Sequence, residues 1–160
     1  MINRKINIVE MKCTHTDLAL VLSDKKTKIY YVSKYYDGKN VDFGVLKQEF
    51  PPELPWFKKF KVLVDLGFIG IDKLYEIKEL IIGEKKPRKS KKNPNTELTK
   101  EQKAKNKAVS KERIFVEHAI GKIKRYRILK NRCRLKCAVT KDRILGIAAG
   151  LWNYQLQLNH

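Results

Sequence analysis

The first half of the chain alternates apolar and polar positions as a β-sheet does. Residues 6–8, 18–22 and 28–33 have the pattern of strands, and polar turns separate them. Residues 42–50 predict a short helix, because their apolar side chains share one face and two prolines follow. The N-terminal region is therefore expected to be mainly a sheet with one helix.

A second group of elements follows. Residues 60–65 predict a buried strand that ends in Asp65, followed by glycines. An acid in this place lies at the carboxyl edge of a strand, where catalytic groups of open α/β sheets usually sit. Residues 71–80 are consistent with a helix and residues 80–83 with a short strand.

Two helices are predicted in the C-terminal half. Thr99 and Gln102 have the spacing of a capping box, which opens a long helix that runs to about Lys130. Thr140 is expected to cap a last helix over residues 142–156. Before the long helix, residues 84–98 contain almost no apolar side chains and predict a mobile basic loop.

The composition of the chain indicates the kind of partner that it binds. The 160 residues and the 42% hydrophobic content fit one globular domain. The 36 Lys and Arg against 17 Asp and Glu give a net charge of +19, which makes nucleic acid the expected partner; a basic, solvated surface is the alternative.

The sequence contains no pattern typical of a signal peptide, a membrane span or a set of disulfides. The N-terminus lacks the apolar run of a signal peptide, and the apolar run at 144–158 is too short and too polar for a membrane span. Cys13, Cys133 and Cys137 are too few and too badly spaced for a disulfide framework or a zinc site. A cytoplasmic protein with reduced thiols, and with no membrane partner, is expected.

The most informative segment is residues 106–124 of the long helix. At the helical period its polar side chains form one stripe, made of Asn106, Ser110, Arg113, Glu117, Gly121 and Lys124. A single carboxylate flanked by cations is the arrangement expected of a side chain that holds a divalent metal beside a phosphate. The alternative is an exposed ion pair on the helix, worth about 0.3–0.5 kcal/mol.

A family resemblance rests on two motifs. The segment Asp65-Leu66-Gly67-Phe68-Ile69-Gly70 resembles the Asp-x-Gly-Tyr-x-Gly segment of DDE-superfamily transposases and endonucleases related to insertion sequence five and to Harbinger elements. The 106–124 helix resembles the family's Glu-bearing helix: Arg113, Glu117 and Lys124 keep the signature spacing, while Ser110 stands where related transposases have Tyr.

Two upstream segments resemble the family as well. They are His15-Thr16 and residues 36–43, where Val41 replaces a His of the family pattern. The resemblance covers about residue 13 to the C-terminus. It implies an α/β, ribonuclease-H-like mixed sheet with flanking helices, and DNA strand cleavage and transfer at insertion-sequence ends.

The resemblance also implies the site. Three carboxylates would hold two Mg²⁺ or Mn²⁺ ions in the complete enzyme, with Asp65 and Glu117 as the second and third carboxylates. Arg113 and Lys124 would complete the catalytic set by orienting the DNA backbone or the scissile phosphate. The supporting residues would be Asn106, Ser110, Gly67 and Gly70.

Two basic segments are candidates for DNA contacts. One is in the loop and consists of Lys85, Lys86, Arg88, Lys89, Lys91 and Lys92. The other follows the Glu-bearing helix and consists of Lys122, Arg125, Arg127, Lys130, Arg132 and Arg134. The second is the better candidate for a defined surface, because a helix holds it in place.

The chain departs from the family at its N-terminus. The family's first Asp sits on a central strand well before the His-Thr segment, whereas only fourteen residues precede His15. Glu10 lies on a possible strand over residues 7–11 but is too close to His15. We therefore expect a non-matching segment at 1–12 and a partial catalytic domain at 13–160, with a sheet that is incomplete at the N-terminus and lacks its central strand.

This departure leaves two functions open. The first is a DDE-type transposase in a truncated or split-frame form, inactive alone, in the bacterial cytoplasm at the nucleoid. Its expected partners are insertion-sequence ends, target DNA, and a second copy or a complementing transposase subunit. The alternative is a non-catalytic basic DNA-binding module, or an accessory or inhibitor of full-length transposase.

Overall fold

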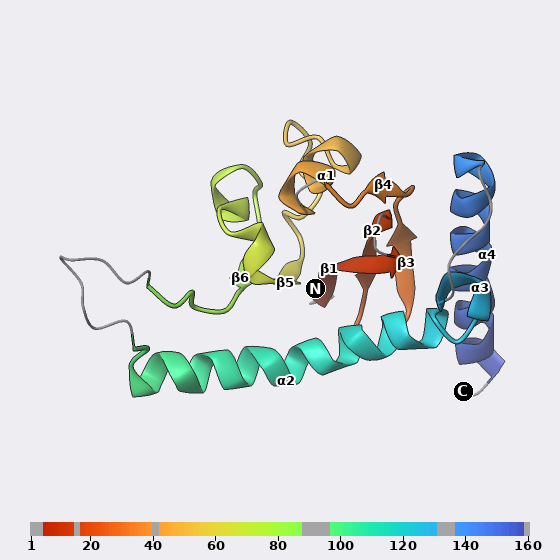
Figure 1. The fold of residues 1–160 in the computed structure, drawn as a ribbon. Coiled ribbons are helices and arrows are strands. Elements are labelled where there is room, and N and C mark those ends of the chain that lie inside the picture. The colour runs from red at the N-terminus through yellow and green to blue at the C-terminus, as the bar shows by residue number, and fades with distance from the viewer. Residues whose placement is uncertain (1–4, 15–16, 40–41, 88–96, 131–136, 159–160) are drawn as a thin grey trace.

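The computed structural model describes residues 5–14, 17–39, 42–87, 97–130 and 137–158 (Figure 1). Its centre is a six-stranded mixed sheet of order β3-β2-β1-β5-β6, with β4 paired to β2. β2 is antiparallel to β1 and β3, while β1, β5 and β6 run parallel. The strands are β1 (Lys5–Thr14), β2 (Asp17–Ser23), β3 (Ile29–Val32), β4 (Tyr36–Asp37), β5 (Lys61–Val64) and β6 (Glu79–Ile81).

Helices flank the sheet on both sides. In Figure 1, α1 lies on one side of the sheet, and the long α2 runs along the other. This is the α/β, ribonuclease-H-like mixed sheet that the sequence predicts. The helices are α1 (Asp42–Glu49), α2 (Lys100–Ile123), α3 (Arg127–Lys130) and α4 (Ala138–Leu158), and two short 3₁₀ turns are η1 (Leu66–Phe68) and η2 (Ile71–Lys73). Within the described ranges, no helix is both long and apolar enough to cross a membrane.

Successive side chains of the central strands supply two separate apolar layers. Ile8 and Val64 face α1, where Leu46 is also buried. Leu63 faces the other way and packs with Val109 of α2. Because both faces are covered, β2 and β5 are largely apolar and their period-two pattern is weak, while β1 mixes apolar residues with polar ones such as the buried Asn7. On β5, alternate side chains therefore face α1 and α2, with Val64 toward α1 and Leu63 toward α2.

The expectation that the central strand is missing is wrong. β1 lies between β2 and β5, and residues 5–12 of it belong to the segment expected not to match. Its apolar side chains alternate between the two layers, with Ile6 and Ile8 on one and Val9 and Met11 on the other. A strand buried on both faces gives little alternation, which explains why the sequence predicted short strand segments at 6–8 and 7–11 but not a central strand of this length.

The region after β5 also differs from expectation. Residues 71–80 are not a helix: η2 ends at Lys73, and β6 begins at Glu79. Tyr75 is buried, and its hydroxyl donates a 2.6 Å hydrogen bond to the carbonyl of Phe50. This contact ties the segment to the end of α1 and overrides the helical pattern.

The two long helices agree with the prediction to different degrees. The capping box of Thr99 and Gln102 opens α2 as predicted, with hydrogen bonds of 3.2 and 3.0 Å. The helix ends at Ile123, and α3 is a separate turn. Thr140 does not cap α4, which begins earlier, at Ala138. Asp142 instead accepts a 2.8 Å hydrogen bond from the backbone of Tyr35, which ties α4 to the sheet.

Candidate active site

The carboxyl end of β5 carries Asp65 out of the sheet. Its Oδ1 accepts a 2.7 Å hydrogen bond from the backbone N–H of Leu66, and Asp65 thereby caps the η1 turn. The side chain remains 40% exposed. The predicted position of this acid, at the edge where a parallel strand ends, is therefore what the structure has.

Gly67 lies where the turn approaches α1. A Cβ at this position would stand 2.7 Å from Oδ2 of Asp42, the first residue of α1. A side chain at this position would displace the Asp42 carboxylate, so glycine allows Asp42 to lie next to the turn that Asp65 opens. Sequence analysis missed Asp42 as a neighbour of this edge; its place at the start of the predicted 42–50 helix is the signal that could have found it.

Gly70 directly precedes the next turn, η2, and is glycine for a different reason. Its φ is +92°, in the left-handed region that side chains with a Cβ rarely adopt. The two glycines of the motif therefore differ in role: Gly67 leaves room for the Asp42 carboxylate, and Gly70 allows a positive φ. Both support the edge on which Asp65 stands.

Arg113 of α2 reaches this edge. Its Nη1 donates to Oδ1 of Asp65 at 2.7 Å, and its side chain is 32% exposed. The predicted site residues Asp65 and Arg113 are thus brought together. Arg113 was expected to orient DNA, and here its guanidinium binds the carboxylate.

The other predicted residues of the polar stripe share α2 with Arg113. Glu117 is exposed and stands four residues beyond Arg113, about 6 Å along the helix axis. Ser110 is exposed, and Lys124 is the partly buried C-cap of the helix. No hydrogen bond or ion pair is found for the Glu117 carboxylate among the described residues, which leaves its oxygens open to a ligand.

Asn106 acts as a tether. Its Oδ1 accepts from the backbone N–H of Glu84 at 2.7 Å, and its Nδ2 donates to the carbonyl of Glu84 at 3.0 Å. This two-way contact fixes α2 to the segment that leaves β6. A Cβ on Gly83 would approach Asn106 Oδ1 to 3.1 Å, so glycine suits that place as well. Asn106 was predicted to support the catalytic residues, and what the structure shows is its contact with the backbone of the adjoining segment.

The place next to Asp65 on β1 holds no acid. Ile8 pairs with Val64 in the parallel register, so Val9 comes level with Asp65 one position further. Val9 packs in the same layer as Leu63, on the α2 side. Glu10 follows on the opposite face of the strand. In the described part of the chain there is no group of three or more His, Cys, Asp or Glu side chains that could hold a metal ion.

Two carboxylates nevertheless fit one kind of ion. Mg²⁺ commonly binds to proteins through one or two carboxylates, keeps several waters and takes phosphate oxygens as its remaining ligands. The oxygens of Asp65 and Glu117 are of this class. A third carboxylate is needed for a two-ion site, and Val9 stands on β1 where that group would be nearest to Asp65.

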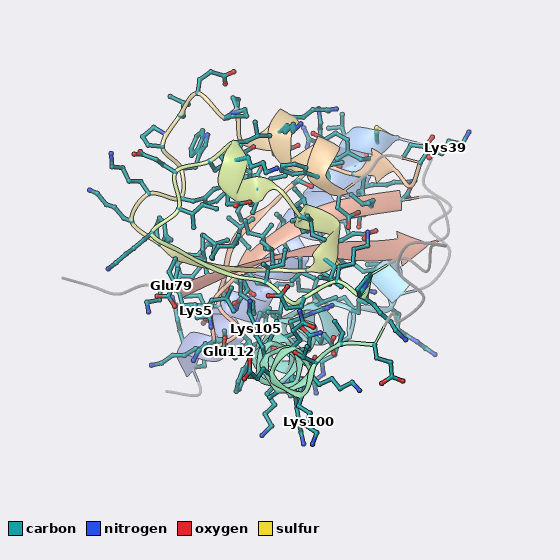
Figure 2. All side chains as sticks on the ribbon, turned by 90° about the vertical axis from the view of Figure 1, so that its left-hand side faces the viewer. Lys5, Lys39, Glu79, Lys100, Lys105 and Glu112 are labelled. Atoms are coloured by element: carbon teal, nitrogen blue, oxygen red, sulfur yellow. The ribbon has the colours of Figure 1, made fainter. Side chains whose placement is uncertain are left out.

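Only some of the predicted DNA-binding residues are described. Lys85, Lys86, Arg125 and Arg127 are exposed, whereas the Nζ of Lys122 lies over the ring of Trp152, 5.4 Å from its centroid. Figure 2 looks along α2 and shows Lys100 directed away from the sheet, where further cations of the helix also reach solvent. The side chains outside the described residues are those of Arg88, Lys89, Lys91, Lys92, Lys130, Arg132 and Arg134, and Cys133 lies outside them too.

Comparisons with known proteins give a family match and a curated relative. Residues 9–153 match the protein family described as DDE superfamily endonuclease. The chain is 32% identical over 143 residues to a probable transposase for insertion sequence element IS702 from Microchaete diplosiphon, across 87% of this chain and 46% of that protein. The chain thus spans about half the length of this curated relative. No solved structure matches it significantly.

Proposed function

The chain belongs to the DDE superfamily endonuclease family, and on that premise we propose that it is the transposase part that supplies two of three catalytic carboxylates, for DNA strand cleavage and transfer at insertion-sequence ends. The observation that carries the proposal is the 2.7 Å contact of Arg113 with Asp65, because it joins the Glu-bearing helix to the carboxyl end of β5. This contact supports a site in which Glu117, four residues further along the same helix, would act together with Asp65.

Asp65 and Glu117 would hold the divalent ion, Mg²⁺ or Mn²⁺. When bound, such ions activate the attacking oxygen and stabilise the leaving oxygen of a phosphodiester. Arg113 binds the Asp65 carboxylate, and its planar, partly exposed guanidinium is of the kind that would pair with a phosphate of the DNA. Lys124 lies about three helical turns beyond Arg113 and would offer a single positive charge to the DNA backbone.

The chain on its own is proposed to be inactive. Val9 stands where β1 comes level with Asp65, so the described residues offer this edge no third acid from the central strand. The missing carboxylate would come from a complementing transposase subunit or a second copy, acting on DNA at the nucleoid of a bacterial cytoplasm. The same observation favours the second candidate, a non-catalytic DNA-binding module or an accessory of full-length transposase.

A cleavage assay tests this proposal. The purified chain is incubated with duplex DNA that carries the element end, in Mg²⁺ and then in Mn²⁺, and strand nicking is followed on a denaturing gel. We expect no nicking by the wild-type chain. Nicking by the wild type that Asp65→Ala abolishes would contradict the inactivity, since it would mean that the chain completes the site alone.

The variant Val9→Asp separates the two candidate functions. It places a carboxylate level with Asp65, so an enzyme fragment is expected to bind Mn²⁺ several-fold more tightly than the wild type. Val9→Asn, of nearly the same size but without charge, is the matched control. If Val9→Asp and Val9→Asn bind Mn²⁺ equally, the non-catalytic module is the better description.

A further inference from the structure

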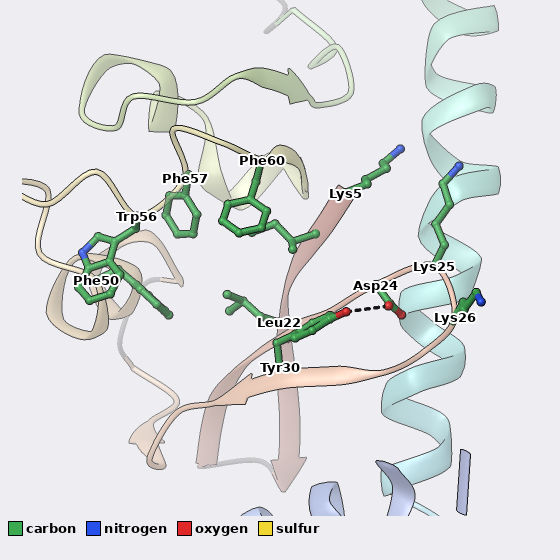
Figure 3. A pocket seen from close by; sticks show the side chains of 11 residues that line it. Lys5, Leu22, Asp24, Lys25, Lys26, Tyr30, Phe50, Trp56, Phe57 and Phe60 are labelled. Atoms are coloured by element: carbon green, nitrogen blue, oxygen red, sulfur yellow. Dashed lines mark hydrogen bonds between the residues drawn. The ribbon is translucent and has the colours of Figure 1, made fainter. Parts of the chain in front are cut away.

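A pocket opens at the edge of the sheet opposite to Asp65. It lies beside Lys5, the first residue of β1, and Phe60, which directly precedes β5. Its volume is about 380 Å³, within the range of small-ligand sites. Figure 3 shows aromatic side chains grouped around an open space, with lysines on one side. The wall is formed by Ile6, Leu22, Tyr30, Phe50, Trp56, Phe57 and Phe60.

Two of the rings are exposed and yet held in place. Tyr30 is 51% exposed, and its hydroxyl donates to Oδ2 of Asp24 at 3.1 Å. Trp56 is 40% exposed, and its Nε1 donates to the carbonyl of Pro51 at 3.0 Å. Phe50 packs edge-on against the indole, with ring centroids 5.4 Å apart. Rings fixed in this way offer flat surfaces at little entropic cost to a ligand that stacks on them.

The pocket also has a cationic side. Lys5, Lys25 and Lys26 contribute to its lining, and Asp24 is the acid among them. Lys5 contacts Glu112 of α2, and the Nζ of Lys25 lies 3.6 Å from the same carboxylate. Three lysines thus face two acids, so the group keeps a positive charge that an anion can neutralise.

We propose that this pocket binds an unpaired nucleotide of a DNA strand, with the base against Tyr30 and Trp56 and its phosphate beside the lysines. Aromatic platforms next to a cationic groove are how proteins hold single-stranded nucleic acid without reading its sequence. DNA is named as the strand on the basis of the proposed function, whereas the pocket itself does not depend on catalysis.

The geometry of the pocket favours an unpaired nucleotide over duplex DNA. Bases in a duplex are stacked and paired, so they cannot enter a lateral pocket unless they are taken out of the helix. β5 is four residues long, which puts the pocket roughly 13 Å from Asp65 at 3.3 Å per residue. A strand bound at the carboxyl edge can therefore also place an unpaired nucleotide here.

The test is fluorescence anisotropy of labelled oligonucleotides in metal-free buffer. Single-stranded oligothymidine and a blunt duplex are titrated with the wild-type chain and with Tyr30→Ala and Trp56→Ala. Loss of one stacking partner is expected to weaken single-strand binding roughly five- to a hundredfold. Duplex binding is expected to change less than twofold, because the duplex does not reach the pocket.

Matched variants make the outcome specific. Tyr30→Phe and Trp56→Phe keep a ring for stacking and are expected to bind single strands nearly as the wild type does. Tyr154→Ala removes a 58% exposed ring on α4, outside the pocket, and is expected to have no effect. These controls distinguish stacking in the pocket from a general loss of aromatic surface.

Three results would overturn the proposal. They are unchanged single-strand affinity in both alanine variants, an equal loss of single-strand and duplex affinity, and displacement of the oligonucleotide by an uncharged apolar peptide at equal concentration. The last result would assign the pocket to a polypeptide. Because no metal is present, failure of the active-site proposal would leave this measurement unaffected.

Discussion

Nη1 of Arg113 lies 2.7 Å from Oδ1 of Asp65, although 48 positions separate the two residues in the sequence. The contact joins α2 to the end of β5 and brings the helix that bears Glu117 to the carboxyl edge. Both side chains are about one-third exposed, at 32% and 40%. Solvent therefore screens the pair, and its main consequence is position, with a free energy of only about 0.5 kcal/mol.

A double-mutant cycle tests this estimate. Asp65→Asn, Arg113→Gln and the double variant are unfolded in urea at low and high salt. The coupling free energy is expected to be below ~1 kcal/mol and to fall as salt increases. A coupling of ~2 kcal/mol or more that salt does not change would contradict the description of the pair as solvent-screened.

Gly67→Ala tests the close approach of α1 to the turn. The added methyl group would stand 2.7 Å from Oδ2 of Asp42, so the turn or the carboxylate must move. A loss of about 1–2 kcal/mol of unfolding free energy is expected. Gly44→Ala is the matched control, because it adds a methyl group in open space on α1 and should be neutral or stabilising. Equal effects of the two substitutions would contradict the account.

Asn106→Ala tests the tether between α2 and the segment after β6. Removal of the amide leaves the N–H and the carbonyl of Glu84 without their partner, which is expected to lower the unfolding free energy by ~1–2 kcal/mol. Lys107→Ala, on the exposed side of the same helix, serves as control and should change it by less than ~0.5 kcal/mol. Hydrogen exchange of the Glu84 amide gives a direct readout, and protection as strong as in the wild type would rule out the tether.

We predict a loss of stability at alkaline pH from the raised pKa values of three tyrosines. Burial raises the pKa of Tyr75 to about 12, and burial together with hydrogen bonds to Glu49 raises the pKa of Tyr31 and Tyr36 still further. In the unfolded chain these phenols ionise near pH ~10. Above that pH the unfolded state has released protons that the folded state retains, so stability is complete below pH ~10 and falls as pH rises.

Urea unfolding between pH ~8 and ~11 measures this fall, and absorbance at alkaline pH counts the phenols that ionise late. Tyr36→Phe removes one of the late groups and is expected to flatten the decline. Tyr154→Phe, at an exposed position on α4, should leave it unchanged. A stability that rises or stays level over this range would contradict the burial of these hydroxyls.

Local signals in the sequence predicted several of the elements that carry the candidate site residues. Asp65 at the end of an apolar strand and the capping box at Thr99 each depend on neighbouring residues, and the structure has both. Gly70 likewise follows from a local need for positive φ. These features could be predicted because no distant contact has to be known.

What sequence analysis missed depends on contacts between distant segments. β1 was not recognised as a central strand, because it is buried on both faces and its register with β5 is set by pairing. Residues 71–80 were assigned to a helix, although the contact of Tyr75 with Phe50 holds that segment otherwise. The approach of Asp42 to Gly67 also joins two elements that no local pattern connects.

The central claim is that Asp65 and Glu117 together hold a divalent ion beside DNA. Its most direct test is the titration of Mn²⁺ by electron paramagnetic resonance, in the presence of an element-end oligonucleotide. Asp65→Ala and Glu117→Ala are each compared with Glu101→Ala, which removes an exposed acid in the first turn of α2. We predict that Asp65→Ala and Glu117→Ala each weaken Mn²⁺ binding at least tenfold while Glu101→Ala leaves it unchanged; equal Mn²⁺ binding by all three variants would contradict the account.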